Sequence, residues 1–560
     1  MFYKFSPPSK SSIFNIIKVL LFAFICLSNS SQASEENAID YSLFSNPSAE
    51  FRSIPFWSLN DKLDTEEVRR QLRSFKKGGY GGAYLHSRIG LLTEFLSEQW
   101  FDIMQAGVDE CKKLEIEAWF YDEDKWPSGT AGGLVPFASS EYHSRTLFRI
   151  QKDRPLPPRS KIISEDDSYR YISYKVKMGN PWYNGSCWVD LLNPNTVEKF
   201  LEVGYQPYIE RFDEELGKTA LGIFSDEPQI RARIEELPQN CGAVSYSPTI
   251  IKAFTEDHGY DITDHLACLF EPVENYRKVR LDYYQTISKQ FEKSFSKKIA
   301  DYCQQNNLIW TGHYNAEESL SSVKRNCGNL MMQYRRMQRP GMDHLGLRIE
   351  KALNVAKSVS SIANQYGRNR TLSELFGVSG QNMSFFDRKW IADWHAVLGI
   401  NHYCPHLSLY SMKGCRKRDY PPTLSLQQPW WKYNKVLEDY LARVCYMVTR
   451  GKFDPEVLVI HPIESVYIED DVTGSIDNTR NDKYYQVLQV LQQYHRNYDL
   501  GDEQIISEIA QVKNGRFVIG DMAYKAVILP HMLTIRKSTC ELLKQFEKQG
   551  MTIRQKATVK

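Results

Sequence analysis

The sequence predicts an α/β protein: a (β/α)8 TIM-like barrel with a small β insertion, followed by a smaller α/β domain. Three observations support this fold class. Short apolar segments alternate with helical patterns through residues 34–450, polar residues follow most of these segments, and the pattern changes near Phe453. At 560 residues the chain is also longer than one core usually organises, which favours a large domain plus a smaller one.

We expect eight parallel strands in the first domain, each a short apolar run bounded by polar residues. They are residues 54–58, 82–86, 117–121, 220–224, 308–311, 330–333, 371–373 and 400–403. Helical patterns lie between most of them. The pattern at 64–75 begins with acidic residues and places Val68, Leu72 and Phe75 on one face. Parallel strands and helices in this number are typical of a barrel whose functional site lies at the carboxyl ends of the strands.

Two further segments have patterns of their own. At about 142–192, alternating stretches such as 169–177 predict a small β insertion. In residues 451–560, the apolar runs 457–460, 517–519 and 526–529 predict a compact α/β domain with a parallel sheet. The chain stops soon after 550–553, where a further strand is expected to begin, so we expect a shortened C-terminus.

Residues 1–33 have the pattern of a secretory signal peptide. Lysines precede the apolar run 19–27, and Ala33 ends a stretch with small residues at the positions that a signal peptidase reads. We therefore expect a secreted or periplasmic protein. The apolar run is too short to span a bilayer, and no later stretch approaches the ~20 apolar residues that a membrane helix needs.

Composition argues against several classes of protein. A net charge of +2 gives no general electrostatic attraction to nucleic acid. No predicted strand is followed by a glycine-rich or Walker-type loop, so we expect no nucleotide cofactor. The cysteines are widely spaced and form no C-x-x-C motif, which argues against a zinc ribbon and a dense disulfide framework.

Polar residues lie at or just past the predicted strand ends, where a barrel would bring them to one cavity. They are His86, Arg88, Asp122, Glu123, Asp226, Glu227, His313, Asn315, Glu317, Glu374, His402 and His406. Among them, Glu227 and Glu374 each follow or end a buried strand. Cleavage of a glycosidic bond requires two carboxyl groups in one active-site cavity. One acts as the acid, and the other acts as the base or the nucleophile.

Several segments resemble the catalytic barrel of glycoside hydrolase family 106. They are Trp57-Ser-Leu-Asn60, 86–91, Tyr121-Asp-Glu-Asp-Lys-Trp-Pro-Ser-Gly129, Ser225-Asp-Glu-Pro228, 311–313, Pro340-Gly-Met-Asp-His344 and Ser373-Glu-Leu-Phe-Gly377. The resemblance extends from about Asn46 to Gly550. It implies a secreted bacterial α-L-rhamnosidase that acts on plant cell-wall polysaccharides such as pectin and inverts the sugar configuration. Members of that family usually continue into β-sandwich domains, which this sequence lacks.

We assign Glu227 as the acid that protonates the leaving oxygen and Glu374 as the base that activates water. Asp226 would help to hold a proton on Glu227, since a neighbouring negative charge raises a carboxyl pKa. Glu317 and Glu318, which follow the fifth predicted strand, are alternatives to Glu374 as the base and could instead bind substrate.

The other polar and aromatic residues near the strand ends are candidates for binding the sugar. They are Trp57, His86, Arg88, Asp122, Glu123, Trp126, Asp226, His313, Asn315, Glu317, Asp343, His344, His402 and His406. Trp57 would either stack on a sugar face or pack in the core. Asp122 and Glu123 would bind sugar hydroxyls or ligate a cation, or they would belong to a rigid loop and pair with Lys125 or Arg88. The family resemblance implies a dependence on Ca²⁺, for which we assign no ligands.

Two other functions are open at this point. His86, His313, His344, His402 and His406 could ligate zinc in a metal-dependent barrel hydrolase, although the first predicted strand lacks the His-x-His pair that such enzymes usually carry. A carbohydrate-binding protein without catalysis is the third interpretation.

Overall fold

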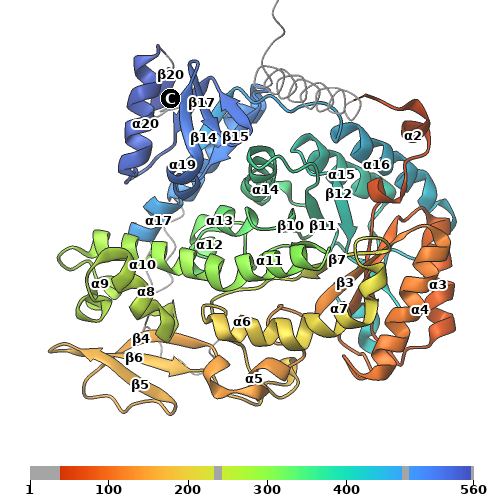
Figure 1. The fold of residues 1–560 in the computed structure, drawn as a ribbon, viewed down its shortest axis with the longest axis horizontal. Coiled ribbons are helices and arrows are strands. Elements are labelled where there is room, and N and C mark those ends of the chain that lie inside the picture. The colour runs from red at the N-terminus through yellow and green to blue at the C-terminus, as the bar shows by residue number, and fades with distance from the viewer. Residues whose placement is uncertain (1–37, 233–241, 470–478, 551, 556–560) are drawn as a thin grey trace, which may run out of the picture.

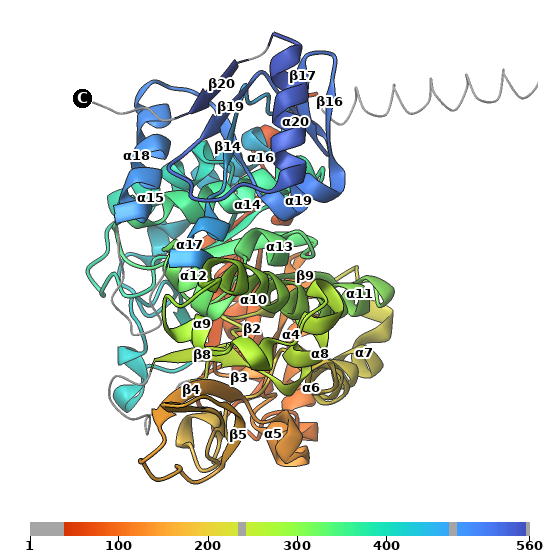
Figure 2. The same ribbon diagram turned by 90° about the vertical axis from the view of Figure 1, so that its left-hand side faces the viewer.

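The computed structural model describes residues 38–232, 242–469, 479–550 and 552–555. They form a central parallel β-barrel, a small antiparallel sheet at one end and a parallel α/β domain at the other (Figure 1 and Figure 2). The predicted fold class is therefore confirmed. The expected signal peptide, residues 1–33, lies outside the described residues.

The barrel is one sheet of order β12-β11-β10-β9-β7-β3-β2-β1-β13 with parallel neighbours. The short strands β12 and β13 share the eighth position, because β12 pairs with β11 and β13 with β1. A hydrogen bond of 3.0 Å from Ile54 N to the carbonyl of Tyr403 joins the two edges. The strands are β1 (Phe56–Leu59), β2 (Gly82–Ser87), β3 (Glu117–Asp124), β7 (Ala220–Ser225), β9 (Ile309–Gly312), β10 (Arg339–His344), β11 (Leu372–Leu375), β12 (His402–Pro405) and β13 (Ser408–Leu409).

Large rings fill the interior of the barrel. They belong to Phe56, Tyr84, Trp119, Tyr121 and Phe224, all fully buried. The ring centroids of Phe56 and Phe224 lie 4.6 Å apart in an edge-to-face contact. Trp119 fits because Gly222 has no side chain: a Cβ there would lie 2.3 Å from the indole ring. The barrel is thus a packed core that fixes the positions of the strand ends.

Helices surround the barrel (Figure 1). The helix expected at 64–75 is α3 (Thr65–Gly78), whose Val68, Leu72 and Phe75 are buried. Asp64 caps it by accepting hydrogen bonds from the backbone N–H groups of Glu66 and Glu67. The other described helices of at least seven residues in this part are α4 (Glu98–Leu114), α6 (Pro194–Phe200), α7 (Gln206–Phe212), α8 (Pro248–His258), α10 (Tyr276–Phe291), α11 (Lys297–Gln305), α12 (Leu320–Asn326), α14 (Leu353–Gln365), α15 (Phe385–Val397) and α16 (Asn434–Val448).

Two strand predictions were wrong in position. Residues 330–333 form the helix α13 (Leu330–Tyr334), capped by the side chain of Asn329, and the sixth strand is β10 instead. A short apolar run has no periodicity that separates a buried strand from a buried helix. The eighth strand begins at His402 rather than at residue 400, which changes the position of that histidine in the barrel.

The insertion is an antiparallel sheet of order β5-β6-β4-β8. Its strands are β4 (Arg145–Gln151), β5 (Ser160–Glu165), β6 (Tyr169–Lys175) and β8 (Ala243–Tyr246). The expected insertion at about 142–192 contains the first three, while β8 is contributed by the segment after β7. This sheet and the short helix α5 (Leu134–Ala138) lie at the opposite end of the molecule from the C-terminal domain (Figure 2).

The C-terminal domain has a parallel sheet of order β15-β14-β19-β20 beside an antiparallel sheet of β16, β17 and β18. The strands are β14 (Val457–Ile460), β15 (Tyr498–Gly501), β16 (Ala510–Lys513), β17 (Arg516–Ile519), β18 (Met522–Tyr524), β19 (Ala526–Leu529) and β20 (Thr552–Gln555). The helices are α17 (Ile463–Glu469), α18 (Thr479–Gln493), α19 (Glu503–Ile509) and α20 (Lys537–Lys548). The domain packs on the barrel helices α10 and α14.

Neither a membrane span nor a disulfide is found in the described part of the chain. None of the helices described there has both the length and the apolar composition needed to cross a bilayer. The cysteines of the same residues are all unpaired. Packing and hydrogen bonds, without covalent cross-links, therefore hold these residues in their fold.

Candidate active site

Four neighbouring strands bring acids and a histidine to one end of the barrel. β7 leads into Asp226 and Glu227, and β9 leads into His313. β10 and β11 carry Asp343 and Glu374, which are direct neighbours across the two strands. Because β7, β9, β10 and β11 are adjacent and parallel, their carboxyl ends place these side chains together.

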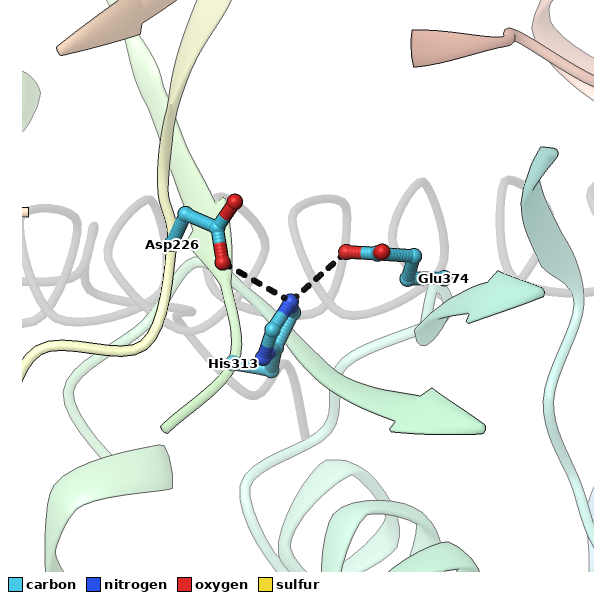
Figure 3. A group of neighbouring side chains, drawn as sticks. All are labelled: Asp226, His313 and Glu374. Carbon is cyan, nitrogen blue, oxygen red and sulfur yellow. Dashed lines mark hydrogen bonds and ion pairs between the residues drawn. The ribbon is translucent and has the colours of Figure 1, made fainter. Parts of the chain in front are cut away.

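His313 connects the acids of β7 and β11 (Figure 3). Its Nε2 lies 2.8 Å from Oε2 of Glu374 and 3.5 Å from Oδ1 of Asp226. All three side chains are buried. The second oxygen of Asp226 is also fixed, because the hydroxyl of Tyr121 donates to Oδ2 at 2.7 Å. One imidazole thus links carboxylates from two strands that are far apart in the sequence.

The neighbouring acids keep His313 protonated. Burial alone would lower the pKa of this imidazole, but the hydrogen bond to Glu374 and the charges of Glu374 and Asp226 raise it well above its usual value. Burial raises the pKa of Glu374, and the hydrogen bond from His313 opposes that rise. An imidazolium that donates to a carboxylate stabilises its ionised form, so Glu374 is suited to act as an anion.

Glu227 is half-buried beside this group and lines an open cavity. Its φ of +50° lies in the left-handed region, which is uncommon for residues other than glycine and frequent at functional positions. Asn315 Nδ2 donates to its Oε2 at 2.9 Å. Burial and the negative charge of Asp226 raise the pKa of Glu227 to about 8, and Glu374 adds to the effect. Glu227 therefore carries a proton at neutral pH.

Asp343 is a further acid of the group. Its Oδ1 is buried and has no hydrogen-bond partner among the described residues. Burial and the negative charge of Glu374 raise the pKa of Asp343 well above its usual range. Beside Glu374 there is thus a carboxyl oxygen that no protein donor uses.

Glu317, one alternative to Glu374 as the base, is occupied by contacts within the protein. Its Oε1 accepts from the backbone N–H of Tyr314 at 2.7 Å and from the hydroxyl of Tyr334, and its Oε2 accepts from the N–H of Asp343 at 3.2 Å. Glu318, the other alternative, has an exposed side chain. These contacts give Glu317 the role of joining the ends of β9 and β10, and they favour Glu374 as the base.

Arg88 joins several loops at the rim. Its guanidinium forms an ion pair with Asp419 at 2.8 Å. It also lies 3.0 Å from Nε2 of His86 and 3.4 Å from Nε2 of His406. Its central carbon lies over the ring of Trp126, 4.0 Å from the ring centroid. Burial and the positive charge of Arg88 lower the pKa values of His86 and His406 well below their usual range. The two histidines are therefore neutral, and Arg88 fixes the position of Trp126.

Asp122 and Glu123 form the base of the loop that carries Trp126. Asp122 accepts hydrogen bonds from the hydroxyls of Ser128, Tyr205 and Ser225. Glu123 accepts from the backbone N–H groups of residues 129–131 and from the hydroxyl of Thr130. Both acids are buried. These contacts favour a structural role in the loop, but the expected pairing with Lys125 or Arg88 is wrong, because Lys125 pairs with Asp124 and Arg88 with Asp419.

Trp57 packs in the core. It is fully buried, its Nε1 donates to Gln71 at 2.9 Å, and its ring centroid lies 5.4 Å from that of Phe75 on α3. Successive side chains of a strand face opposite sides, and Trp57 faces the surrounding helices. Of the two interpretations made for this residue, core packing therefore holds, and stacking on a sugar does not.

Two of the predicted histidines lie away from the strand-end group. His402 is the first residue of β12, so the prediction that it lies at or past the end of its strand is wrong; its Nε2 contacts the hydroxyl of Tyr84 at 3.3 Å inside the barrel. His344 ends β10 but faces α15, where its ring centroid lies 4.9 Å from that of His395. The histidines expected to crowd one end of the barrel are therefore dispersed.

A cavity of about 550 Å³ opens beside Glu227 and Asn315. The aromatic residues in its lining are Trp126, Tyr174, Trp182, Tyr183, Trp188 and Tyr420. Of these aromatic residues, only Trp126 was predicted from the sequence. Residues that follow barrel strands can be predicted from the strand pattern, but that pattern does not show which insertion folds over the end of the barrel. The run Pro181-Trp-Tyr183 is a signal that could have found part of this lining.

Residues 184–560 match the model of glycoside hydrolase family 106, described as alpha-L-rhamnosidase. The chain belongs to this family. The matched region includes Asp226, Glu227, His313, Asp343 and Glu374, so the resemblance inferred from the sequence motifs is confirmed. Membership of this family makes cleavage of a glycosidic bond the function to be tested for this chain.

Individual proteins similar to this family member are distant in sequence. A curated relative from Formosa agariphila, named "Putative beta-glucuronidase", is 20% identical over 616 residues, with 91% of this chain and 49% of the relative covered. The chain thus spans about half of the length of that relative. Among solved structures, the rhamnosidase from Novosphingobium sp. PP1Y is 13% identical with a TM-score of 0.65, covering 91% of this chain and 69% of that one. A β-galactosidase from Rahnella sp. R3 is 11% identical with a TM-score of 0.58, covering 91% and 71%. The structural likeness shows a shared fold.

Proposed function

We propose that the protein removes terminal α-L-rhamnosyl residues from plant polysaccharides or glycosides, with Glu227 as the acid and Glu374 as the base. One observation carries this proposal. The two carboxyl groups lie in one strand-end group but in different environments: Glu227 has a pKa raised to about 8, whereas Glu374 accepts a hydrogen bond of 2.8 Å from a protonated His313. One protonated and one ionised carboxyl group are what glycoside hydrolysis requires.

In the proposed reaction, the proton of Glu227 moves to the glycosidic oxygen as the bond from that oxygen to the rhamnose C1 breaks. Glu374 removes a proton from a water molecule, which attacks C1 from the opposite face and inverts its configuration. His313, held by Asp226, stabilises the ionised form of Glu374. Asn315 orients the carboxyl group of Glu227 through its hydrogen bond.

Calcium is part of the proposal, because the donor set fits a hard cation. Ca²⁺ prefers carboxylate oxygens, and Asp343 offers a buried oxygen without a protein donor next to Glu374. Asp343 would hold the ion, and the neighbouring Glu374 would stay free to act as the base. When bound, it would supply positive charge to a group rich in acids and would polarise sugar hydroxyls.

A metal-dependent hydrolase is a second candidate, because ligand atoms of Asp226, His313 and Glu374 all lie within 4.8 Å of one another. A metal-bound histidine must give up the proton on its ligating nitrogen. In the glycosidase, His313 Nε2 instead donates to Glu374 at 2.8 Å, so the two candidates differ in whether this nitrogen carries a proton or a metal. A binding protein without catalysis is the third candidate and differs from both in showing no turnover.

Secretion belongs to the proposal as well. It is supported by the lysines, apolar run and small residues of segment 1–33. Export would bring the enzyme to polymers too large to enter a cell. Detection of the mature protein outside the cytoplasm, with its N-terminus at residue 34, is the expected result.

The proposed function is tested by comparing the wild-type protein with Glu227→Gln and Glu374→Gln on a rhamnosyl disaccharide and on 4-nitrophenyl α-L-rhamnoside. Each variant should lose about 1,000-fold or more in kcat on the disaccharide while the fold is retained. The nitrophenol leaving group needs less help from an acid, so it should partly rescue Glu227→Gln and leave Glu374→Gln inactive.

Equal rescue of both variants would show that the two roles are assigned incorrectly. The anomer formed first, observed by NMR, should have the inverted configuration. Activity on an ester or amide that a zinc-selective chelator abolishes would support the metal-dependent hydrolase. Binding of rhamnosides without any turnover would support the third candidate.

A further inference from the structure

We propose that the cavity beside Glu227 binds the leaving group, and that it takes a pyranose sugar against the corner formed by Trp126 of the barrel and Trp182 of the insertion. This inference rests on the proposed function, because Glu227 as acid defines where the leaving group lies. It adds the chemical class of that group and a binding role for the inserted sheet.

The position of the cavity relative to the two carboxyl groups supports this inference. Glu227 and Asn315 are part of its lining, whereas Glu374 is buried and is not among the described residues that line it. The acid contacts the oxygen that departs with the leaving group, and the base acts on the other side of the cleaved sugar. The cavity of about 550 Å³ next to Glu227 therefore lies where the leaving group would bind. Its volume is typical of a ligand pocket.

The aromatic walls of this space form a corner. The ring centroids of Trp126 and Trp182 lie 4.5 Å apart with an interplanar angle of 81°, and Tyr420 lies 5.5 Å from Trp126 at 76°. Arg88 covers one face of Trp126, but the two indoles are only half-buried and Tyr420 is 46% exposed, so part of the ring surface is available to a ligand. A corner suits a pyranose, which can place its apolar face on one ring and turn its polar edges toward the amide side chains of the lining.

Polar groups complete the lining of the same cavity. Asn180 and Gln229 lie in it together with Asn315. Amide side chains carry both donors and acceptors, and sugar hydroxyls need both. The aromatic rings of the lining therefore match the apolar face of a sugar, and the amide side chains match its hydroxyl groups.

Hydrogen bonds within the protein hold this corner together. Trp182 Nε1 donates to the backbone carbonyl of Trp126 at 2.5 Å, which fastens the insertion to the barrel loop. Asn184 reinforces this contact by donating to Asp124 at 2.7 Å and accepting from Lys125 at 2.7 Å. A preformed site loses little conformational entropy on binding, so its aromatic contacts contribute fully to affinity.

The test measures kcat/KM of Trp182→Ala on three substrates: a rhamnosyl-hexose disaccharide, a flavonoid rhamnoside and α-L-rhamnosyl fluoride. Fluoride is too small to reach Trp182, so its hydrolysis reports only on the chemistry at the cleaved sugar. We expect a loss of about ten-fold on the disaccharide, mainly in KM. Hydrolysis of the fluoride should change less than about two-fold.

Two further variants separate stacking from other effects. Trp182→Phe keeps an aromatic face but loses the hydrogen bond to Trp126, so it should retain most of the activity on the disaccharide. Trp390→Ala removes a more exposed tryptophan, 43%, on α15 and outside the lining of the cavity, and it should leave all three substrates unaffected. Circular dichroism and Tm verify that each variant is folded.

Equal losses on the disaccharide and the fluoride in folded Trp182→Ala would overturn the leaving-group assignment. A larger loss on the flavonoid rhamnoside than on the disaccharide would overturn the sugar assignment in favour of an aromatic aglycone. A wild-type protein that does not hydrolyse the fluoride would refute the proposed function itself, and this inference with it.

Discussion

His313, which follows β9, donates a hydrogen bond of 2.8 Å to Glu374 on β11, so the contact passes over the end of the intervening strand β10. This contact gives the two candidate catalytic acids different protonation states. Glu374 faces an imidazolium, whereas Glu227 faces an amide from Asn315 and the negative charge of Asp226. The same cluster of acids therefore contains an anion and a proton donor at one pH.

Replacing His313 by glutamine should reduce kcat/KM about ten- to a hundred-fold and shift the acidic limb of the pH profile to higher pH. The imidazolium lowers the pKa of Glu374, so without it Glu374 would ionise only at a higher pH. The measurement is kcat/KM against pH. The exposed His495, with φ of +52°, allows His495→Asn as a matched control. An acidic limb that stays in place would show that Glu374 does not control it.

Activity should fall on the alkaline side as Glu227 loses its proton. Because burial and Asp226 raise the pKa of this acid to about 8, the protonated form that catalysis needs is present below that pH and lost above it. We expect kcat/KM to decrease about ten-fold per pH unit above pH ~8 on a substrate with a sugar leaving group. In Glu227→Gln, assayed on the nitrophenyl glycoside, this limb should be missing. Its persistence would assign the limb to another group.

The barrel could be predicted because each strand is an apolar run that ends in polar residues. That rule found Glu227, His313 and Glu374, whose positions depend only on the ends of β7, β9 and β11. It failed at 330–333, an apolar run that could equally be a strand or a helix. This run is a helix in the structure, with Asn329 as its N-terminal capping residue. A local pattern of four residues does not contain the tertiary contacts that decide between the two.

The contacts between the loops could not be predicted in the same way. Trp182 reaches the carbonyl of Trp126 because the insertion folds back over the barrel, and Arg88 reaches Asp419 because two rim loops meet. Both pairs are distant in sequence. The sequence also leaves open which way a strand residue faces, and for this reason Trp57 could be recognised as a core residue only in the structure.

Replacing Glu123 by glutamine should destabilise the loop that carries Trp126. Its carboxylate accepts several backbone N–H groups, and an amide nitrogen in the place of one oxygen would oppose those donors. We expect a loss of about 2–4 kcal/mol in the free energy of unfolding, together with a raised KM. Urea denaturation measures the first and steady-state kinetics the second. Glu94→Gln, at an exposed position, is the control; equal stability of the two variants would contradict the role given to Glu123.

Calcium should raise the Tm of the wild-type protein by a few degrees, and EGTA should reverse the change, because an ion bound only by the folded state stabilises it. Asp343→Asn should abolish this response, because the amide cannot carry the negative charge that binds the ion and keeps only one oxygen. In the wild type, Oδ1 of Asp343 has no protein hydrogen-bond donor and is available to the ion. In EGTA this variant should be at least as stable as the wild type, because burial and Glu374 already raise the pKa of Asp343 and make its charge unfavourable. Differential scanning fluorimetry provides the measurement, with the exposed Asp167→Asn as control. A calcium shift of the same size in Asp343→Asn would place the ion elsewhere in the molecule.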